Sequence, residues 1–197
     1  MHLRGGSSKG LYFTSQDLPP ESTDRDQVLL SAMGGADRRQ IDGLGGADPL
    51  TSKAAIVGLS EREDADLDYL FLQVIVGEDR VDTSPNCGNI LAGVVPFAIE
   101  SGLITIQGKE TSAVIHMVNS GNLCEVIVQT ADDQVNYEGD VKIDGVPGTS
   151  APIVCNYLEP AGSATGALLP TGKIKDHING IDVTCIDNGM PVVVIRA

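Results

Sequence analysis

Cys87 occupies the position of a reactive thiol. It lies within Pro85-Asn86-Cys87-Gly88-Asn89, directly before an apolar segment that predicts a buried helix. The N-terminus of a helix leaves backbone N–H groups unpaired and carries a partial positive charge, which favours a thiolate and can hold a substrate carboxylate. Gly88 would let a ligand approach the backbone, and Asn86 and Asn89 offer amide donors. The alternative is that Cys87 is a small buried hydrophobic residue beside a turn.

Lys53 is a candidate base. It follows a glycine-rich segment, residues 40–52, and opens an apolar run at residues 54–57. Removing an ammonium group partly from water favours its neutral form, and the neutral amine can accept a proton from carbon. The alternative is an exposed lysine on the rim of the protein.

The turn at residues 4–10 is a candidate ligand-binding loop. Its two cations, Arg4 and Lys9, and its two hydroxyl groups, Ser7 and Ser8, suit a carboxylate. A tight, solvated turn is the alternative.

The sequence lacks the motifs of several common sites. The glycine pairs do not complete a GxGxxG loop, and no Gly-Lys pair is followed by Ser or Thr as in a Walker A loop. There is no HExxH or CxxC motif, and the three histidines are dispersed. The GxSxG motif of many serine hydrolases is absent, although the spacing of residues alone does not exclude a Ser/His/Asp catalytic triad. We therefore expect no nucleotide and no metal ion.

Charge and composition narrow the class of protein further. The 197 residues include 13 Lys and Arg against 27 Asp and Glu, which gives a formal charge of -14. An acidic chain without clustered cations disfavours binding to nucleic acid or to an anionic membrane surface. No apolar run approaches the roughly 18 residues of a spanning helix, and no signal peptide is evident. Few, scattered cysteines predict a reduced, cytoplasmic protein.

Two helices are expected. Residues 17–34 have helical spacing of apolar residues, with Asp24 as a cap and Gly34 as the terminator. Residues 89–104 are apolar on nearly all sides, which is typical of a helix enclosed by other structure. Pro96 should kink that helix or lie near its start.

The rest of the chain predicts short strands. Residues 68–76 form a nearly continuous apolar strand that we expect to be covered on both faces. A buried helix among many strands predicts an α+β fold in which a mixed or antiparallel sheet curls around a central helix. The other expected strand segments are 113–118 and 123–129 as a hairpin, 134–141, 143–154, and 181–186 with 192–195.

Four motifs together resemble the PrpF protein family, over essentially the whole chain. They are residues 4–10 (Arg-Gly-Gly-Ser-Ser-Lys-Gly), residues 40–53 (Gln-Ile-Asp-Gly-Leu-Gly-Gly-Ala-Asp-Pro-Leu-Thr-Ser-Lys), Asn86-Cys87-Gly88-Asn89, and residues 184–193 (Thr-Cys-Ile-Asp-Asn-Gly-Met-Pro-Val-Val). The combined pattern most resembles the 4-oxalomesaconate branch of that family. Ser7 stands where threonine is common, which keeps the hydroxyl group.

The resemblance implies a diaminopimelate-epimerase-like fold with an active site between two similar domains. Because family members are close to twice this length, we expect an epimerase-like domain at residues 1–180, followed by strands or a crossover at 181–197 toward a second domain. The resemblance assigns the catalytic lysine to Lys53 and the catalytic cysteine to Cys87, without a metal or organic cofactor. The oligomeric state is left open, with a homodimer as one option.

The implied activity is that of an isomerase or tautomerase acting on a small unsaturated di- or tricarboxylic acid such as 4-oxalomesaconate. Alternatives are an isomerase of 2-methylaconitate or aconitate, a truncated domain that binds but does not react, and an amino-acid epimerase. An amino-acid epimerase would be expected to have two cysteine thiols that face each other. The presence of Lys53 and Cys87 in one domain argues against this alternative. The residues expected to bind substrate carboxylates are Arg4, Ser7, Ser8, Asn86, Gly88, Asn89, Asn119, Ser120 and Gly121.

Overall fold

The central strand of the protein is apolar on both faces. In β4 (Leu67–Val74) of the computed structural model, odd-numbered apolar residues pack in one core cluster and even-numbered ones pack in another. Successive side chains of a strand point to opposite faces, so this pattern places β4 between two layers. The prediction of a strand covered on both faces is confirmed.

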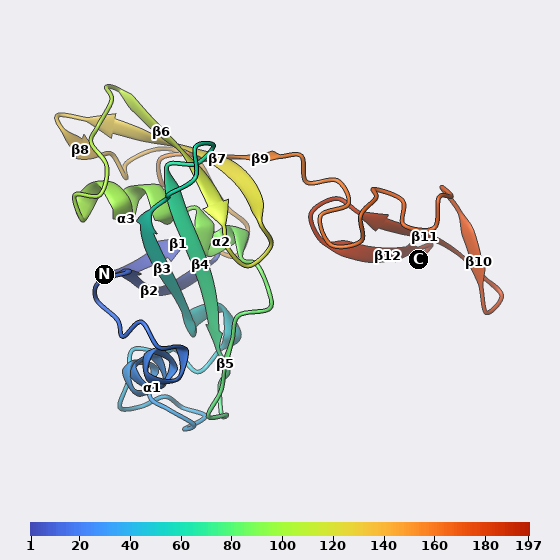
Figure 1. Cartoon of the computed structure of the whole chain (residues 1–197), viewed down its shortest axis with the longest axis horizontal. Helices are drawn as coiled ribbons and strands as arrows, with labels where there is room; N and C mark the ends of the chain where they lie inside the picture. Colours follow the sequence, from blue (N-terminus) through green and yellow to red (C-terminus); the bar gives the residue numbers. More distant parts are fainter. The chain divides into compact units, whose positions relative to one another are not determined.

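The structure describes residues 1–197, which divide into a first unit, Met1–Asn156, and a second unit, Tyr157–Ala197. The first unit is built on a nine-stranded sheet with the order β1-β2-β3-β4-β6-β7-β8, in which β5 also pairs with β4 and β9 with β7 (Figure 1). The pairs β2–β3 and β4–β6 are parallel, so the sheet is mixed. Its other strands are β1 (His2–Gly5), β2 (Ser8–Thr14), β3 (Lys53–Leu59), β5 (Val81–Asp82), β6 (Glu110–Met117), β7 (Asn122–Ala131), β8 (Gln134–Val135) and β9 (Ile153–Leu158).

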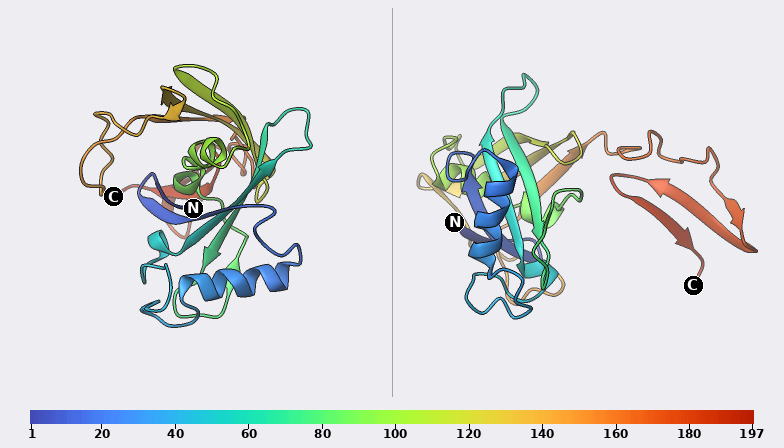
Figure 2. Two further views of the ribbon diagram at one scale, coloured as in Figure 1. Left: turned by 90° about the vertical axis from the view of Figure 1, so that its left-hand side faces the viewer. Right: turned by 60° about the horizontal axis from the view of Figure 1, so that its bottom comes forward.

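Two short helices, α2 (Gly88–Leu91) and α3 (Val94–Glu100), lie inside the curl of this sheet (Figure 2). A helix over 89–104, kinked by Pro96 or with Pro96 near its start, was expected, and the helix is interrupted between Leu91 and Val94. At Gly93 in this interruption, a Cβ atom would overlap the buried Tyr12 hydroxyl. Pro96 is the third residue of α3, so its missing N–H falls in the first turn, where no helical partner exists. The helix ends before 104 because Gly102 adopts a left-handed conformation, with φ of +75°.

The helix α1 (Ser22–Met33) covers the opposite face of the sheet, through Leu29, Leu30 and Met33. It is shorter than the predicted 17–34, and Asp24 is not its cap. Glu21 occupies the cap position without a side-chain bond, and Asp24 lies in the first turn. The predicted stop is confirmed, because left-handed Gly34 donates its N–H to the last turn.

The β6–β7 hairpin follows its prediction, whereas the segment after it does not. Residues 134–154 were expected to be largely strand, but β8 has two residues and β9 begins only at Ile153. Between them runs a long segment, the 136–152 loop, which contains two prolines and two glycines with positive φ. Prolines cannot donate to a sheet ladder, and the glycine conformations turn the chain.

Two thiols meet where β9 pairs with β7. Cys124 of β7 is fully buried, and Cys155 of β9 is half-buried against the same core. The hydrogen bond between them raises the pKa of Cys124, which burial raises further, and it lowers the pKa of Cys155.

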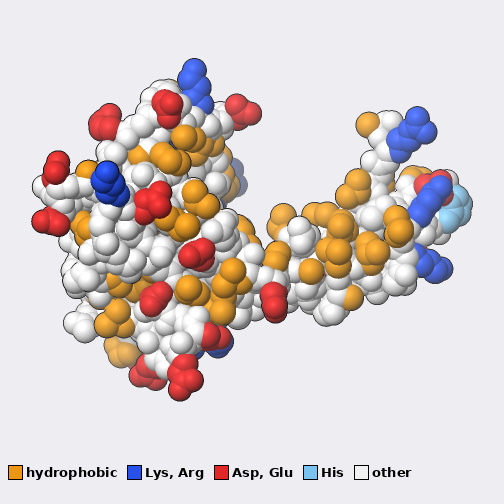
Figure 3. Space-filling model, turned by 90° about the horizontal axis from the view of Figure 1, so that it is seen from above, with side chains coloured by type: hydrophobic (Ala, Val, Ile, Leu, Met, Phe, Trp, Pro, Cys, Tyr) orange, Lys and Arg blue, Asp and Glu red, His pale blue; other side chains and the backbone are white.

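The second unit is a three-stranded antiparallel sheet of β10 (Asp176–Ile178), β11 (Ile181–Asp187) and β12 (Pro191–Ile195). The hairpin predicted over 181–195 is confirmed. The domain boundary expected at residue 180 lies in the turn between β10 and β11. Hydrophobic side chains gather on the surface of this unit (Figure 3), and every residue of β12 is exposed. Across the whole structure, none of the helices has the length and apolar character that a membrane span requires.

The second unit should be the least protected part of the 197-residue chain in amide hydrogen exchange. Only Val183 and Asp187 have buried side chains there, and so few buried contacts cannot hold a sheet closed. We expect protection of β11 and β12 to be roughly a hundredfold lower than that of β4. Equal protection in an exchange experiment read by mass spectrometry would contradict this expectation.

Candidate active site

Lys53 is the first residue of β3 and is 8% exposed. Its Nζ donates a hydrogen bond to Oε1 of Gln73 at 2.6 Å and lies 5.0 Å from the centre of the Phe71 ring. Both contacts are with uncharged groups, so the ammonium is available to pair with an anionic ligand. The expectation of a partly desolvated lysine at the start of an apolar strand agrees with this burial.

The segment before Lys53 is held by Gln40, which sequence reasoning did not single out. Gln40 is buried, and its Nε2 donates to Ser52 Oγ at 2.7 Å while its Oε1 accepts the Ala47 N–H at 2.9 Å. Gly45 packs so tightly on the Gln40 amide that a Cβ atom would overlap it. This packing explains why the segment before the lysine is rich in glycine.

Cys87 precedes the single turn of α2 as its cap residue and is half-buried. Its carbonyl oxygen accepts a hydrogen bond from the Tyr69 hydroxyl at 3.0 Å. Burial raises the pKa of Tyr12, and the nearby Cys87 raises it further, so the Tyr12 phenol stays protonated. Tyr12 donates that proton to the Ile90 carbonyl at 2.6 Å. Tyr69 thus bonds the Cys87 carbonyl directly, and Tyr12 bonds the following helix α2 at Ile90.

Lys53 and Cys87 lie over the same face of β4. Tyr69, Phe71 and Gln73 are consecutive same-face residues of that strand, spaced roughly 7 Å apart. Tyr69 bonds the Cys87 carbonyl, whereas Phe71 and Gln73 contact the lysine amine. The strand thus places on one face two residues that are far apart in the sequence. Gln73 was missed in the sequence, although a glutamine inside an apolar strand was a usable signal.

The turn after β1 is fastened to the start of α2. The Asn89 Nδ2 donates to Ser7 Oγ at 3.1 Å and to Ser8 Oγ at 3.3 Å, and the Ser7 N–H donates back to Asn89 Oδ1. Gly5 and Gly6 touch Asn89 so closely that a Cβ atom on either would overlap it. Two of the sequence motifs therefore meet beside Cys87, and exposed Asn86 and Gly88 flank it.

The predicted ligand residues of the β6–β7 turn are engaged with the protein itself. The Asn119 Oδ1 accepts the Phe71 N–H at 2.8 Å, and its Nδ2 donates to the carbonyls of Phe71 and Thr83 at 2.9 and 2.7 Å. Ser120 accepts the Asn122 N–H, and Gly121 has a positive φ of +77° that the turn requires. In the structure, Asn119 positions the backbone beneath the Lys53 amine.

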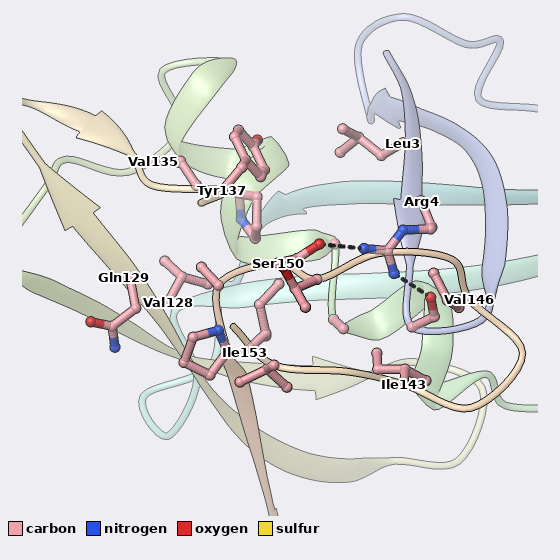
Figure 4. A pocket seen from close by; sticks show the side chains of 18 of the residues that line it. Leu3, Arg4, Val128, Gln129, Val135, Tyr137, Ile143, Val146, Ser150 and Ile153 are labelled. Carbon is pink, nitrogen blue, oxygen red and sulfur yellow. Dashed lines mark hydrogen bonds between the residues drawn. The ribbon is translucent and has the colours of Figure 1, made fainter. Parts of the chain in front are cut away.

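Arg4 lines a cavity that Lys53 does not line. Its guanidinium donates to the Gly6 carbonyl at 2.6 Å and to Ser150 Oγ at 3.0 Å (Figure 4). It lines a cavity to which Gly88 and Asn89 also contribute, but Lys53 and Cys87 do not. The predicted site residues therefore fall into a Lys53–Cys87 group joined by β4, a Ser7–Ser8–Asn89 cluster beside it, and Arg4 on the cavity wall.

The chain matches known proteins over its full length. The PrpF protein family matches residues 1–197. The chain is 57% identical to 4-oxalomesaconate tautomerase of Pseudomonas putida and 56% identical to (4E)-oxalomesaconate Delta-isomerase of a Novosphingobium species. These matches cover 99% and 100% of this chain, but 54% and 55% of the relatives. The chain thus spans about half the length of these curated relatives.

A solved structure gives the same result for the fold. The crystal structure of methylitaconate-delta-isomerase matches with a TM-score of 0.90 at 45% identity, over 100% of this chain and 52% of that one. The predicted α+β class, a diaminopimelate-epimerase-like mixed sheet around a central helix, is confirmed. From its motifs, its fold and its relatives, this chain belongs to the PrpF protein family.

Proposed function

We propose that the protein carrying this chain is a cofactor-independent isomerase that moves a proton within a small unsaturated di- or tricarboxylic acid, such as 4-oxalomesaconate. The observation that carries the proposal is the placement of Lys53 and Cys87 over one face of β4. The similarity to a tautomerase and an isomerase of oxalomesaconate supports the choice of substrate.

In the proposed reaction, the neutral Lys53 amine takes a proton from a carbon next to a carbonyl group or along an allylic system. The C–H electron pair moves into a dienolate, whose spread negative charge the new ammonium stabilises in a site shielded from water. The Cys87 thiol then gives a proton to the carbon at the other end of the conjugated system. One C–H bond breaks, another forms and the double bond shifts, so no electrons are gained or lost. The two residues can exchange roles for the reverse direction.

Substrate carboxylates would bind around Cys87. The hydroxyls of Ser7 and Ser8, the Asn86 amide and the backbone N–H groups at Gly88 and Asn89 are the candidate donors. Donors of this kind fix a carboxylate without adding bulk. A cytoplasmic location is part of the proposal and rests on the scattered free cysteines.

Substrate conversion distinguishes this function from that of a domain that binds but does not react. We would assay the 197-residue chain and the product of the complete reading frame in deuterium oxide, following 4-oxalomesaconate, 2-methylaconitate and aconitate by proton NMR. The expected result is conversion of 4-oxalomesaconate above the other two acids, with deuterium entering the carbon that is protonated. If neither protein converts any of the three acids, the isomerase proposal is wrong.

A further inference from the structure

The first unit contains a cavity of about 310 Å³ beside the central helices. Residues of β1, of α2 and α3 and of the 136–152 loop line it (Figure 4). Its volume is within the range of small-molecule sites. Most of its wall is aliphatic, including Leu3, Val128, Val135, Val141, Ile143 and Ile153.

Arg4 is the only charged residue that lines this cavity. The chain has 27 acidic residues, yet none of them is in the lining, and the guanidinium is bonded only to the neutral Gly6 carbonyl and Ser150 hydroxyl. A guanidinium forms its strongest bonds with a carboxylate, which it can hold through two parallel N–H donors. The cavity therefore offers one cationic group in a wall that is mostly aliphatic and otherwise contains only uncharged polar residues.

We propose that the cavity is a binding site for an apolar monocarboxylate, meaning an aromatic or branched aliphatic acid with one carboxylate. The carboxylate would bind Arg4, and the hydrocarbon body would contact the aliphatic wall. A second or third carboxylate would be pressed against valine and isoleucine without a cation, which is costly. A tricarboxylic acid is therefore a poor ligand here. Lys53 and Cys87 do not line the cavity, although Gly88 and Asn89 border both the cavity and the proposed substrate site.

The 136–152 loop supplies the closing element. Val141 and Ser150 are joined by two backbone hydrogen bonds of 3.1 Å, which fold the loop back over the cavity, and Ser150 then accepts from Arg4. An incoming carboxylate replaces this neutral acceptor with a charged one, and bonds to charged groups are the stronger. Gly88 and Asn89 form part of the same wall and adjoin Cys87, so the ligand would contact the segment that carries the thiol.

Titration of the 197-residue chain with benzoate tests the proposal, read by calorimetry and by amide NMR shifts. Benzyl alcohol is the matched ligand without a carboxylate, and tricarballylate is the polar tricarboxylate. We expect saturable benzoate binding with shifts in β1 and the 136–152 loop, and weaker binding of both controls by about tenfold or more. Benzyl alcohol binding as tightly as benzoate, or tricarballylate displacing it, would overturn the proposal.

Variants locate the site independently of any catalytic activity. Arg4→Gln should weaken benzoate binding by about tenfold or more, whereas Ser150→Ala, which removes the competing acceptor, should preserve or strengthen it. Val146→Trp should block binding by filling the cavity, with an unchanged thermal midpoint as the check on folding. Lys53→Met should bind benzoate like the parent, so a failure of the isomerase proposal leaves this one standing. Parental affinity in both Arg4→Gln and Val146→Trp would overturn it.

Discussion

Replacing Lys53 with methionine should lower the rate of 4-oxalomesaconate isomerisation by roughly 10²- to 10⁴-fold in the product of the complete reading frame. Methionine keeps an unbranched side chain against Phe71 but cannot accept a proton or stabilise a dienolate. The measurement is the rate of substrate conversion together with the rate of solvent deuterium incorporation. Both should fall, because proton abstraction precedes both.

The matched control is Lys109→Met, since Lys109 is an exposed lysine on the chain just before β6. It should leave both rates unchanged. Lys53→Arg keeps a cation but not a base at neutral pH, so a rate near that of Lys53→Met identifies the base function. Cys87→Ser should also be strongly impaired. If Lys53→Met and Cys87→Ser both convert the substrate at the parental rate, the proposed roles are wrong.

Asn119→Ala should lower the free energy of unfolding by roughly 2–4 kcal/mol. The substitution leaves the Phe71 N–H and the carbonyls of Phe71 and Thr83 without their amide partners. The two part-buried bonds to Phe71 cost about 1–2 kcal/mol each when unmade, whereas the bond to the Thr83 carbonyl is exposed and water can replace it. Urea denaturation followed by circular dichroism measures the change.

Two further variants separate positioning from substrate contact at this turn. Ser120→Ala removes only a local turn bond and should change stability by less than about 0.5 kcal/mol. Asn119→Asp keeps the acceptor for Phe71 N–H but directs an oxygen at two carbonyls, so it should be as unstable as the alanine variant. An Asn119→Ala protein of parental stability with only a raised KM would instead identify Asn119 as a substrate ligand.

The strands β4, β6 and β7 were predicted from their apolar runs and the turn between β6 and β7, whereas β1, β2 and β5 were not, and residues 4–10, expected as a turn, lie largely in β1 and β2. The sequence of β4 specifies burial on both faces, and Asn119-Ser120-Gly121-Asn122 specifies the turn between β6 and β7. The central helix was predictable in place but not in form. Pro96 predicted an interruption and lies near the start of α3, whereas the close contact of Gly93 with the Tyr12 hydroxyl joins distant parts of the chain and has no local sequence pattern.

The residues of the candidate site were predictable, but the contacts that each of them makes were not. Lys53, Cys87 and the glycine-rich turn were identified from sequence and from the family resemblance. Two hydrogen bonds could not be predicted because their partners are far apart in the sequence. Asn119 bonds Phe71 across 48 residues, and Arg4 bonds Ser150 across 146 residues. In the 136–152 loop, strands were predicted from β-prone residues but are absent, because prolines and left-handed glycines prevent continuous strand pairing there.

The paired thiols of β7 and β9 affect how the chemistry of Cys87 can be probed with labelling reagents. Cys155 belongs to the same exposure class as Cys87, and the hydrogen bond from Cys124 lowers its pKa, so an alkylating agent has a second candidate target; Cys185, in that class too, is a third. Loss of activity on alkylation, or a count of modified sulfurs, therefore cannot be assigned to Cys87 in the native sequence. A background in which both Cys155 and Cys185 are serine makes the stoichiometry of modification interpretable.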